Sequence, residues 1–232
     1  MAEYPHAAEE VSVTEKAESQ PLADRLAKRI RALLISGELL PGQRVSEAGF
    51  SDRFEVSRNS LREAFRLLTK DGLLRHETNR GVFVATPNVA SIMDIYRVRR
   101  MLECGALRQA WRLHPAVKAM REAVEEAETK REEQDWHAVG SANMKFHSAI
   151  VDLADSARLS DFYERVAAEL RLGFGLLDNL EQLHAPFIDM NKTIVTLTEK
   201  GENSQACHEM ETYLNLSERA LLKAFERASY LG

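Results

Sequence analysis

The sequence predicts a mainly α-helical protein: an N-terminal winged helix-turn-helix domain followed by an all-helical bundle. Over residues 21–87 the apolar periodicity has the order helix, turn, helix, turn, helix and two short strands, which is the order of a winged helix-turn-helix. From about residue 88 onward the periodicity is helical throughout. The 232 residues are enough for two compact domains.

Composition excludes several classes of protein. Charged residues make up 29% and hydrophobic residues 44% of the chain, an ordinary globular balance. No window approaches the ~18 uninterrupted apolar residues of a membrane span, and two cysteines without metal spacing favour a cytoplasmic location. The sequence contains no phosphate-binding glycine loop, nucleophile elbow or HExxH motif, so we expect neither enzyme activity nor a cofactor.

Charge is distributed unevenly along the chain. Residues 21–87 carry 12 Lys and Arg against 8 Asp and Glu, whereas the whole chain has a net charge of −5. A basic block inside an acidic protein is typical of a DNA-reading module joined to an acidic partner domain. Residues 1–20, rich in Glu and Ala, are predicted to form a flexible tail.

Capping and turn signals divide the first domain, residues 21–87, into short elements. Ser46 and Ser57 are suitable helix N-caps, and Gly37 is a C-terminal helix signal. The predicted elements are, in order, a helix over 22–36, a turn at 41–42, a second helix after 46, a third helix from 57–60 to 70, and strands over 73–76 and 82–84. The two strands would form the wing.

The second domain, residues 88–232, is predicted to contain six helices. Its helical periodicity is interrupted near His114-Pro115, Asp135, Asp155-Ser156, His184-Ala185-Pro186 and Gly201. These helices would form an all-helical bundle.

The third helix of the first domain has an apolar face and a basic face. Its apolar stripe, at helical spacing, consists of Leu61, Ala64, Phe65 and Leu68. Its basic row, four residues apart, consists of Arg58, Arg62, Arg66 and Lys70. Guanidinium groups in such a row can hold phosphates or contact guanine in the major groove. The alternative is a solvated face on which Glu63 and Asp71 pair with the basic residues.

Short polar side chains at the start of this helix lie beside backbone amides that favour phosphate. In the wing turn, Arg80 could reach an adjacent groove. The candidate DNA-binding residues are therefore Arg44, Ser57, Arg58, Asn59, Ser60, Arg62, Arg66, Arg80 and Gly81.

Four ordered segments closely resemble the DNA-binding domain of GntR-family bacterial transcription regulators. They are Gly37-x3-Pro41-Gly42-x3-Ser46-Glu47, Val56-Ser57-Arg58-x2-Leu61-Arg62-Glu63-Ala64, Asp71-Gly72-Leu73-Leu74 and Arg80-Gly81-Val82-Phe83-Val84. The resemblance implies DNA contacts from residues 57–60 and Arg62, and a wing tip at Arg80-Gly81. Ser60 stands where many members have Pro, and Gly49 costs about 1 kcal/mol relative to Ala in the second helix.

The helical remainder resembles, more loosely, the FCD effector domain of the FadR branch of this family. The supporting segments are Arg99-Arg100-Met101-Leu102-Glu103, Phe146-His147 and Lys200-Gly201-Glu202. Six helices rather than seven favour the VanR-like subgroup. The resemblance implies that residues 88–232 bind an effector and form the dimer interface. We expect a homodimer, because a single half-site of ~4 bp provides little affinity.

Four helices of the second domain place polar residues on faces that their apolar neighbours predict to be buried. These residues are Arg99, Asn143, His147, Asn191 and Tyr213. An unpaired buried polar group costs roughly 1–3 kcal/mol, so we expect the five to converge on a polar effector cavity. Arg99 would then favour an anionic, carboxylate-bearing effector. The alternative is a set of separately satisfied core polar groups.

Many FCD domains hold a divalent metal with one Asp and three His. At the matching positions this chain has Asn143, His147, Asn191 and Tyr213, so only His147 is retained. Neutral amides are poor ligands and a phenol must lose a proton to bind well, so we expect no tightly bound metal. His184 and His208 lie off these positions and are predicted to be at the surface.

The sequence therefore predicts a cytoplasmic transcription regulator that binds double-stranded operator DNA as a homodimer. A small organic effector would change the relative placement of the two DNA-reading heads, and repression relieved by the effector is the expected direction of control. Two alternatives stay open. One is a metal-dependent regulator of the same fold, and the other is an enzyme that uses the winged helix for protein interaction.

Overall fold

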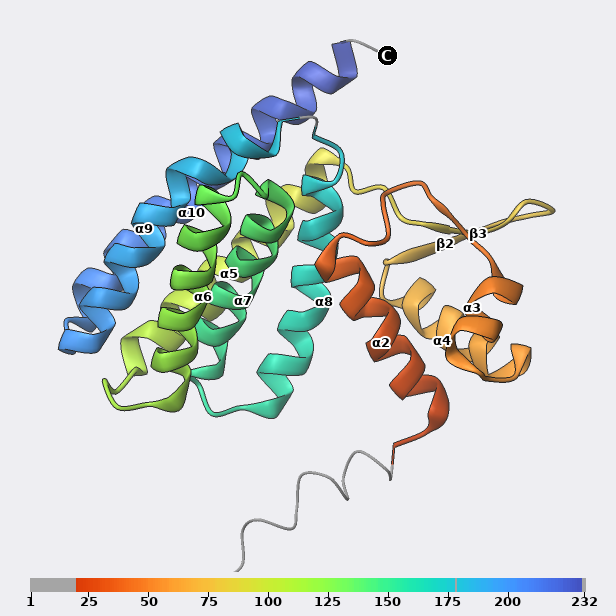
Figure 1. Ribbon diagram of the computed structural model, residues 1–232, viewed down its shortest axis with the longest axis horizontal. Helices are drawn as coiled ribbons and strands as arrows, with labels where there is room; N and C mark the ends of the chain where they lie inside the picture. The colour runs from red at the N-terminus through yellow and green to blue at the C-terminus, as the bar shows by residue number, and fades with distance from the viewer. Residues whose placement is uncertain (1–19, 178, 231–232) are drawn as a thin grey trace, which may run out of the picture.

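The computed structural model describes residues 20–177 and 179–230, so the predicted tail lies outside the described residues except for Gln20. The chain forms two parts. Three helices and a small sheet form the N-terminal part, on the right in Figure 1, and six long helices form the C-terminal part on the left. Helices α2 and α8 lie side by side where the two parts meet.

The N-terminal part has the predicted winged helix-turn-helix order. Its elements are α2 (Leu22–Ser36), β1 (Arg44–Val45), α3 (Glu47–Phe54), α4 (Arg58–Lys70), β2 (Leu74–Glu77) and β3 (Gly81–Val84). Gly37 ends α2 in the left-handed conformation, at φ 80°. The Ser46 and Ser57 side chains cap α3 and α4 by accepting hydrogen bonds from the backbone N–H groups of Gly49 and Ser60. The predicted capping is therefore confirmed at both helices.

The sheet contains one strand that the sequence did not predict. Its order is β1-β3-β2, and both neighbouring pairs are antiparallel. β1 has two residues, Arg44 and Val45, which is too short for a periodic signal. Its pairing with β3 places Arg44 opposite Phe83, in the same cross-strand row as Arg75 of β2.

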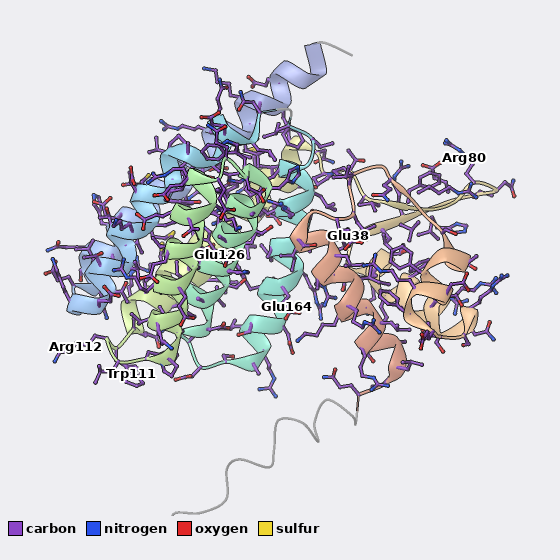
Figure 2. The ribbon with its side chains drawn as sticks, in the orientation of Figure 1. Glu38, Arg80, Trp111, Arg112, Glu126 and Glu164 are labelled. Carbon is purple, nitrogen blue, oxygen red and sulfur yellow. The ribbon has the colours of Figure 1, made fainter. Side chains whose placement is uncertain are left out.

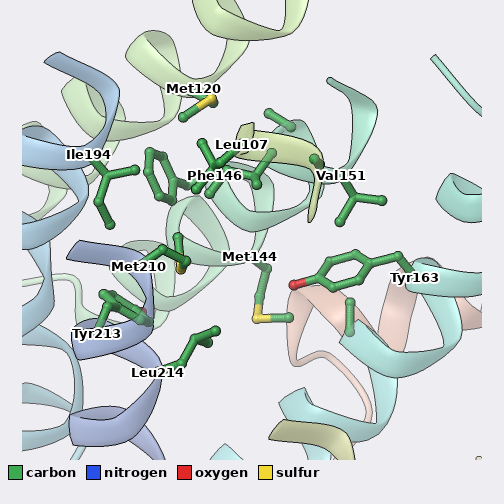
Figure 3. Packing of buried hydrophobic residues seen from close by; sticks show 14 of the residues in the cluster. Leu107, Met120, Met144, Phe146, Val151, Tyr163, Ile194, Met210, Tyr213 and Leu214 are labelled. Atoms are coloured by element: carbon green, nitrogen blue, oxygen red, sulfur yellow. The ribbon is translucent and has the colours of Figure 1, made fainter. Parts of the chain in front are cut away.

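The described C-terminal part contains the six predicted helices. They are α5 (Val89–Gln109), α6 (Pro115–Glu132), α7 (Trp136–Asp152), α8 (Ala157–Phe174), α9 (Leu180–Lys200) and α10 (Asn203–Tyr230). α7 is the central helix and packs against α5, α6, α8 and α9. Figure 3 shows its residues Met144 and Phe146 in the core beside residues of neighbouring helices. In residues 20–177 and 179–230, no helix combines the length and apolar character needed to cross a membrane.

One predicted helix boundary is wrong. His184-Ala185-Pro186 lies inside α9, and the interruption falls instead between Phe174 and Leu180, where the Asn179 side chain caps α9. Pro186 lacks a backbone N–H, but Leu183 and Phe187 on either side of it are buried in the core. Packing of this apolar face outweighs the local helix-breaking signal.

The two parts share one helix. Ala168 and Leu172 of α8 are buried in the hydrophobic cluster of the winged helix, whereas the other side of α8 packs into the helical bundle. Ion pairs flank this contact: Asp71 pairs with Arg31 of α2 at 2.8 Å and with Arg165 of α8 at 3.4 Å. A displacement of α8 therefore acts directly on the packing of the winged helix.

Candidate DNA-binding face and effector site

The predicted basic row of α4 is exposed. Arg62 pairs with Glu47 of α3 at 2.9 Å and Arg66 pairs with Glu63 at 3.0 Å, and both guanidinium groups remain more than half exposed. Exposed ion pairs of this kind contribute little stability, so a DNA phosphate can replace the carboxylate at small cost. Asp71 does not serve as a partner of this row, because it pairs with arginines of α2 and α8.

The start of α4 is held in a defined geometry by its own serines. Ser57 Oγ accepts a hydrogen bond from the Ser60 N–H at 3.1 Å and lies 2.9 Å from Ser60 Oγ. Arg58 and Asn59 stand exposed between these two residues. The two serines thus fix the helix terminus, and the residues between them are free to contact DNA.

The wing presents arginines on an exposed turn. Arg80 is 73% exposed and lies at the end of the wing farthest from the helical bundle (Figure 2). The neighbouring residues Asn79 and Gly81 have φ values of 63° and 107°. Because Gly81 has no Cβ, its positive φ carries no steric cost. The Arg44 guanidinium approaches Gly81 closely, at 3.5 Å from where a Cβ would lie.

Arg75 is a candidate DNA-binding residue that the sequence prediction missed. It lies on β2 opposite Phe83, in the same row as Arg44, and its guanidinium is 5.4 Å from the Phe83 ring centre. Arg80 lies 5.5 Å from the same ring, and both Arg75 and Arg80 pair with Glu77. The available signal was that Arg75 follows the buried Leu74 and therefore faces solvent if the segment is a strand. Its place opposite Phe83 depends in addition on the register between the strands.

All five predicted effector residues are buried in one part of the bundle. Asn143 joins two of its neighbours: its Oδ1 accepts hydrogen bonds from Asn191 Nδ2 at 2.7 Å and from the Tyr213 hydroxyl at 3.1 Å. The His147 ring packs against the Tyr213 ring at a tilt of 59°, with 4.8 Å between ring centres. The structure therefore brings α7, α9 and α10 together at a polar cluster.

Two further residues complete this polar cluster, and sequence analysis missed both. Glu103 bonds to Arg99 Nε at 2.6 Å and to His147 Nδ1 at 2.7 Å, and it accepts a hydrogen bond from the Tyr163 hydroxyl at 2.8 Å. Figure 3 shows Tyr163 pointing its hydroxyl from α8 into the bundle. The available signal for Glu103 was its position four residues after Arg99, one helical turn along the same face.

This arrangement corrects the expected state of Arg99. Sequence analysis predicted that Arg99 is a buried cation whose counter-charge comes from an anionic effector. In the structure, Glu103 supplies this counter-charge from within the protein. Burial opposes ionisation of Glu103, yet Arg99 and His147 outweigh burial and lower its pKa to about 2. Burial also lowers the pKa of His147, so the imidazole is neutral at pH 7. The core of the cluster is thus an internally neutralised pair.

The unpaired atoms of the cluster are hydrogen-bond acceptors. Because His147 Nδ1 faces an ionised carboxylate, that nitrogen carries the proton and Nε2 is left as an acceptor. His147 Nε2 and Asn191 Oδ1 are both buried and have no hydrogen-bond partner among the described residues. Buried acceptors without partners are costly, so this cluster is suited to a ligand that donates O–H or N–H groups.

The cluster does not fit the divalent metal that many FCD domains hold. Asn143 Oδ1 already accepts two hydrogen bonds, and burial raises the pKa of the Tyr213 phenol, which keeps it protonated. Among the four positions that match the metal ligands of the family, His147 is then the single strong ligand.

Cys104, Cys207 and Glu211 form a second group of possible metal ligands, with donor atoms within 4.8 Å of one another. The sequence separation of the cysteines hid this proximity. Burial raises the pKa of Cys104 to about 12, so its thiol stays protonated at neutral pH and is a poor ligand.

The predicted surface location holds for one of two histidines. His208 is exposed, but His184 is 3% exposed and lies against Phe174, with 5.3 Å between ring centres. The surface prediction for His184 was wrong because it assumed a chain break at 184–186, whereas α9 continues through it and buries this face. Burial lowers the pKa of His184 to about 3.

Comparison with known proteins agrees with this two-part organisation. Residues 22–84 match the gntR family of bacterial regulatory proteins, and residues 94–216 match the FCD domain. The fold is similar to a crystal structure of a candidate GntR transcriptional regulator from Rhodococcus sp. RHA1. That similarity has a TM-score of 0.79 and 34% identity and covers 87% of this chain and 98% of that one.

Curated relatives are regulators as well. The chain is 28% identical to the HTH-type transcriptional regulator YdhC of Bacillus subtilis over 151 residues, which are 60% of this chain and 63% of YdhC. It is 26% identical to the transcriptional repressor RspR of Escherichia coli over 159 residues, which are 65% of this chain and 67% of RspR. The aligned region thus spans less than two thirds of YdhC. The chain belongs to the GntR family of bacterial regulatory proteins and carries the FCD domain in its helical part.

Proposed function

We propose that this protein is an effector-responsive transcription regulator that binds operator DNA through α4 and the wing. The observation that carries the proposal is the exposed arginine-bearing face formed by the start of α4, where Arg58 and Arg62 lie, and by the wing with Arg80. Guanidinium groups on a recognition helix and on a wing suit base edges and phosphates respectively. The family membership and the regulator relatives support this function over the enzyme alternative.

A homodimer is the proposed DNA-binding form. Met93 and Met101 lie about two turns apart on α5 and are 38% and 78% exposed, with the exposed Arg97 between them. Leu216 of the adjacent α10 is 47% exposed. Methionine is enriched in protein–protein interfaces, so we infer that α5 contributes to the dimer contact. Two winged helices held by such an interface could read two half-sites of one operator.

Met101→Glu tests this assembly. The substitution replaces the most exposed apolar side chain of α5 with a carboxylate, so we expect light scattering to report a monomer where the native protein is a dimer. Operator affinity should fall with it, because one winged helix reads one half-site. Arg112→Glu, which also adds an acidic exposed residue but lies outside α5 and α10, is the matched control. An unchanged mass for Met101→Glu would place the dimer interface elsewhere.

The proposed effector is a small organic molecule bound at the polar cluster. The unpaired acceptors His147 Nε2 and Asn191 Oδ1 favour a ligand with hydroxyl or N–H donors. A carboxylate on the effector stays a prediction from the sequence, and it would have to share Arg99 with Glu103. The residues of the same cluster disfavour the alternative of a metal-dependent regulator, and stoichiometric zinc or nickel in the purified protein would overturn that conclusion.

Coupling between the effector site and DNA is proposed to run through α8. Tyr163 of α8 donates a hydrogen bond to Glu103 in the polar cluster, and Leu172 of the same helix is buried in the winged-helix core. A ligand that changes the Glu103 hydrogen bonds would therefore favour a different position of α8 and of the DNA-reading head. Repression that the effector relieves is the proposed direction, as the name of the relative RspR also suggests.

The first test is a fluorescence-anisotropy titration with DNA from upstream of the protein's own gene, at two salt concentrations and with a scrambled duplex as control. We expect tight, sequence-selective binding that weakens as salt rises. Arg58→Ala and Arg62→Ala should each cost about 1–3 kcal/mol of operator binding. Arg112→Ala should bind normally, because Arg112 lies at the opposite end of the molecule from Arg80 (Figure 2). Full binding by both α4 variants would reject the proposed DNA-binding face.

A further inference from the structure

A second buried guanidinium, that of Arg171 on α8, has no counter-charge. Arg171 is 4% exposed, and no carboxylate of the described residues lies within ion-pair distance of it. Its Nη2 makes two long hydrogen bonds to backbone carbonyls, at 3.4 Å to Ser36 and 3.3 Å to His137. Its Nη1 is buried and has no partner in the described part of the chain. Arg171 thus differs from Arg99, whose charge Glu103 neutralises.

His184 presents a second unpaired nitrogen at the same place. Its Nε2 is buried and lacks a hydrogen-bond partner among the described residues. Both this atom and Arg171 Nη1 face Gly140 of α7: they lie 2.8 and 2.3 Å from the point that a Cβ on Gly140 would occupy. A glycine at this position is therefore what allows the two nitrogens to converge.

The charges around this point are basic. The exposed His137, one turn before Gly140 on α7, lowers the pKa of His184 together with burial and with Arg171. The guanidinium of Arg171 and the ring of His184 thus meet where α7, α8 and α9 join, with His137 nearby, and no described carboxylate forms an ion pair with Arg171. A fixed buried cation without a counter-ion is strongly unfavourable, so the arrangement calls for a negative partner from outside the chain.

We propose that Arg171 and His184 form a binding site for a small oxyanion, carrying a carboxylate or phosphate group, at the junction of the two parts. A guanidinium provides donors only, and a neutral imidazole with its proton on Nε2 adds another donor. This is the opposite of the polar cluster at Glu103, whose unpaired atoms are acceptors. The two sites would therefore bind chemically different ligands.

The position of the site gives it a route to the winged helix. Ser36 is the last residue of α2, and the Arg171 guanidinium also packs against Gly37, at 2.8 Å from the place of its Cβ. An oxyanion at Nη1 would pull the guanidinium away from the Ser36 carbonyl, whose hydrogen bond to Nη2 is already long at 3.4 Å. Occupancy would thus alter how α8 holds the C-terminal end of α2, separately from the effector cluster.

Thermal unfolding of the full chain in Tris chloride, with inorganic phosphate or acetate added at constant ionic strength, tests the proposal. We expect at least one anion to raise the Tm by several degrees in a saturable way. The two probes distinguish a phosphate from a carboxylate ligand. Arg171→Met should lose this shift, whereas Arg158→Met, an exposed arginine of the same helix, should keep it. No saturable shift with either anion, or an equal shift in Arg171→Met, would overturn the proposal.

A purely structural role for Arg171 makes a different prediction. If Arg171 only held the Ser36 and His137 carbonyls, Arg171→Met would lower the Tm equally with and without the anions, and that result would also overturn the proposal. The proposed role predicts a loss confined to the anion-containing samples, since the methionine removes an uncompensated charge.

Nuclear magnetic resonance of the native chain provides a readout that needs no folded variant of Arg171. At pH 6.5 the ring signals of His184 should shift saturably as the same anion is added, while those of the exposed His208 should not. Absence of a selective His184 shift would contradict anion binding at this site. Neither measurement uses DNA, so a negative result here is distinct from a failure of operator binding.

Discussion

The DNA-binding face and the polar cluster use the same chemical pair, arginine with glutamate, under opposite conditions. On the DNA-binding face, Arg62 and Glu47 are 54% and 34% exposed, so solvent screens their attraction and either partner can exchange. In the polar cluster, Arg99 and Glu103 are 1% and 0% exposed. Removing one partner there leaves an uncompensated charge in the interior. Surface pairs are therefore available for binding DNA, whereas the interior pair must remain complete for the fold.

The largest expected effect that tests this contrast is on stability. Glu103→Leu leaves Arg99 buried without a counter-charge and also removes the hydrogen-bond partner of His147 and Tyr163. We expect a loss of about 3–5 kcal/mol in the free energy of unfolding, measured by urea denaturation. The double variant Glu103→Leu with Arg99→Met should recover part of that loss, because it removes the buried charge that has lost its partner. A single-variant loss below about 1 kcal/mol would mean that the interior pair behaves like a surface pair.

The pH dependence of stability should come from interior groups. His184 has a folded pKa of about 3 against an ordinary value of 6.5, so below pH 6.5 the unfolded chain takes up a proton that the folded chain does not. Stability should thus fall as pH decreases from 6.5 towards 3, by up to ~1.4 kcal/mol per pH unit for each such group. The lowered pKa of His147 acts in the same direction.

Below pH 4.5 the lowered pKa of Glu103 adds a further loss, which develops as pH falls towards about 2. Urea denaturation of the native protein between pH 7 and pH 5 covers the range in which the loss from the histidines develops and that from Glu103 does not. His184→Leu should flatten this dependence, and His208→Leu, a change at an exposed histidine, should leave it as it is. Equal slopes for His184→Leu and native protein would contradict the buried, neutral state of His184.

The smallest expected effect concerns Arg75, on the wing. Because its side chain is 48% exposed and pairs with Glu77, Arg75→Ala should leave the free energy of unfolding within about 0.5 kcal/mol of native. Operator binding should weaken by about 1 kcal/mol, and the salt dependence should decrease by about one counterion, as for the loss of one phosphate contact. A titration at several salt concentrations measures both. Unchanged affinity would restrict the wing contacts to Arg44 and Arg80.

The DNA-binding part was more predictable from the sequence than the interior of the bundle. Ser46, Ser57 and Gly37 act within one or two turns of their own position, so capping signals located the helices of the winged domain. The exposure of Arg58 and Arg62 followed from helical spacing alone. By contrast, the two-residue strand β1 and the wing position of Arg75 depend on pairing between strands, which spacing does not reveal.

In the helical part, periodicity correctly indicated that Arg99, His147 and Tyr213 face inward. It did not indicate their partners: Glu103 was overlooked beside Arg99, and Tyr163 reaches the cluster from another helix. Pro186 was interpreted as a helix break because the destabilising effect of proline within a helix can be read from the local sequence. The burial of Phe187, which outweighs this effect, depends on residues distant in the sequence.

By itself, the sequence determined which faces of the helices are apolar, where most of the helices begin and end, and which arginines of α4 are exposed. These properties depend on neighbours within a few residues. The tertiary structure alone decided that Glu103 neutralises Arg99 within a network, that α8 serves both cores, and that Arg171 and His184 meet over Gly140 without a counter-charge. The reason is that the electrostatic state of a buried group depends on residues brought near it by packing, from any distance along the chain.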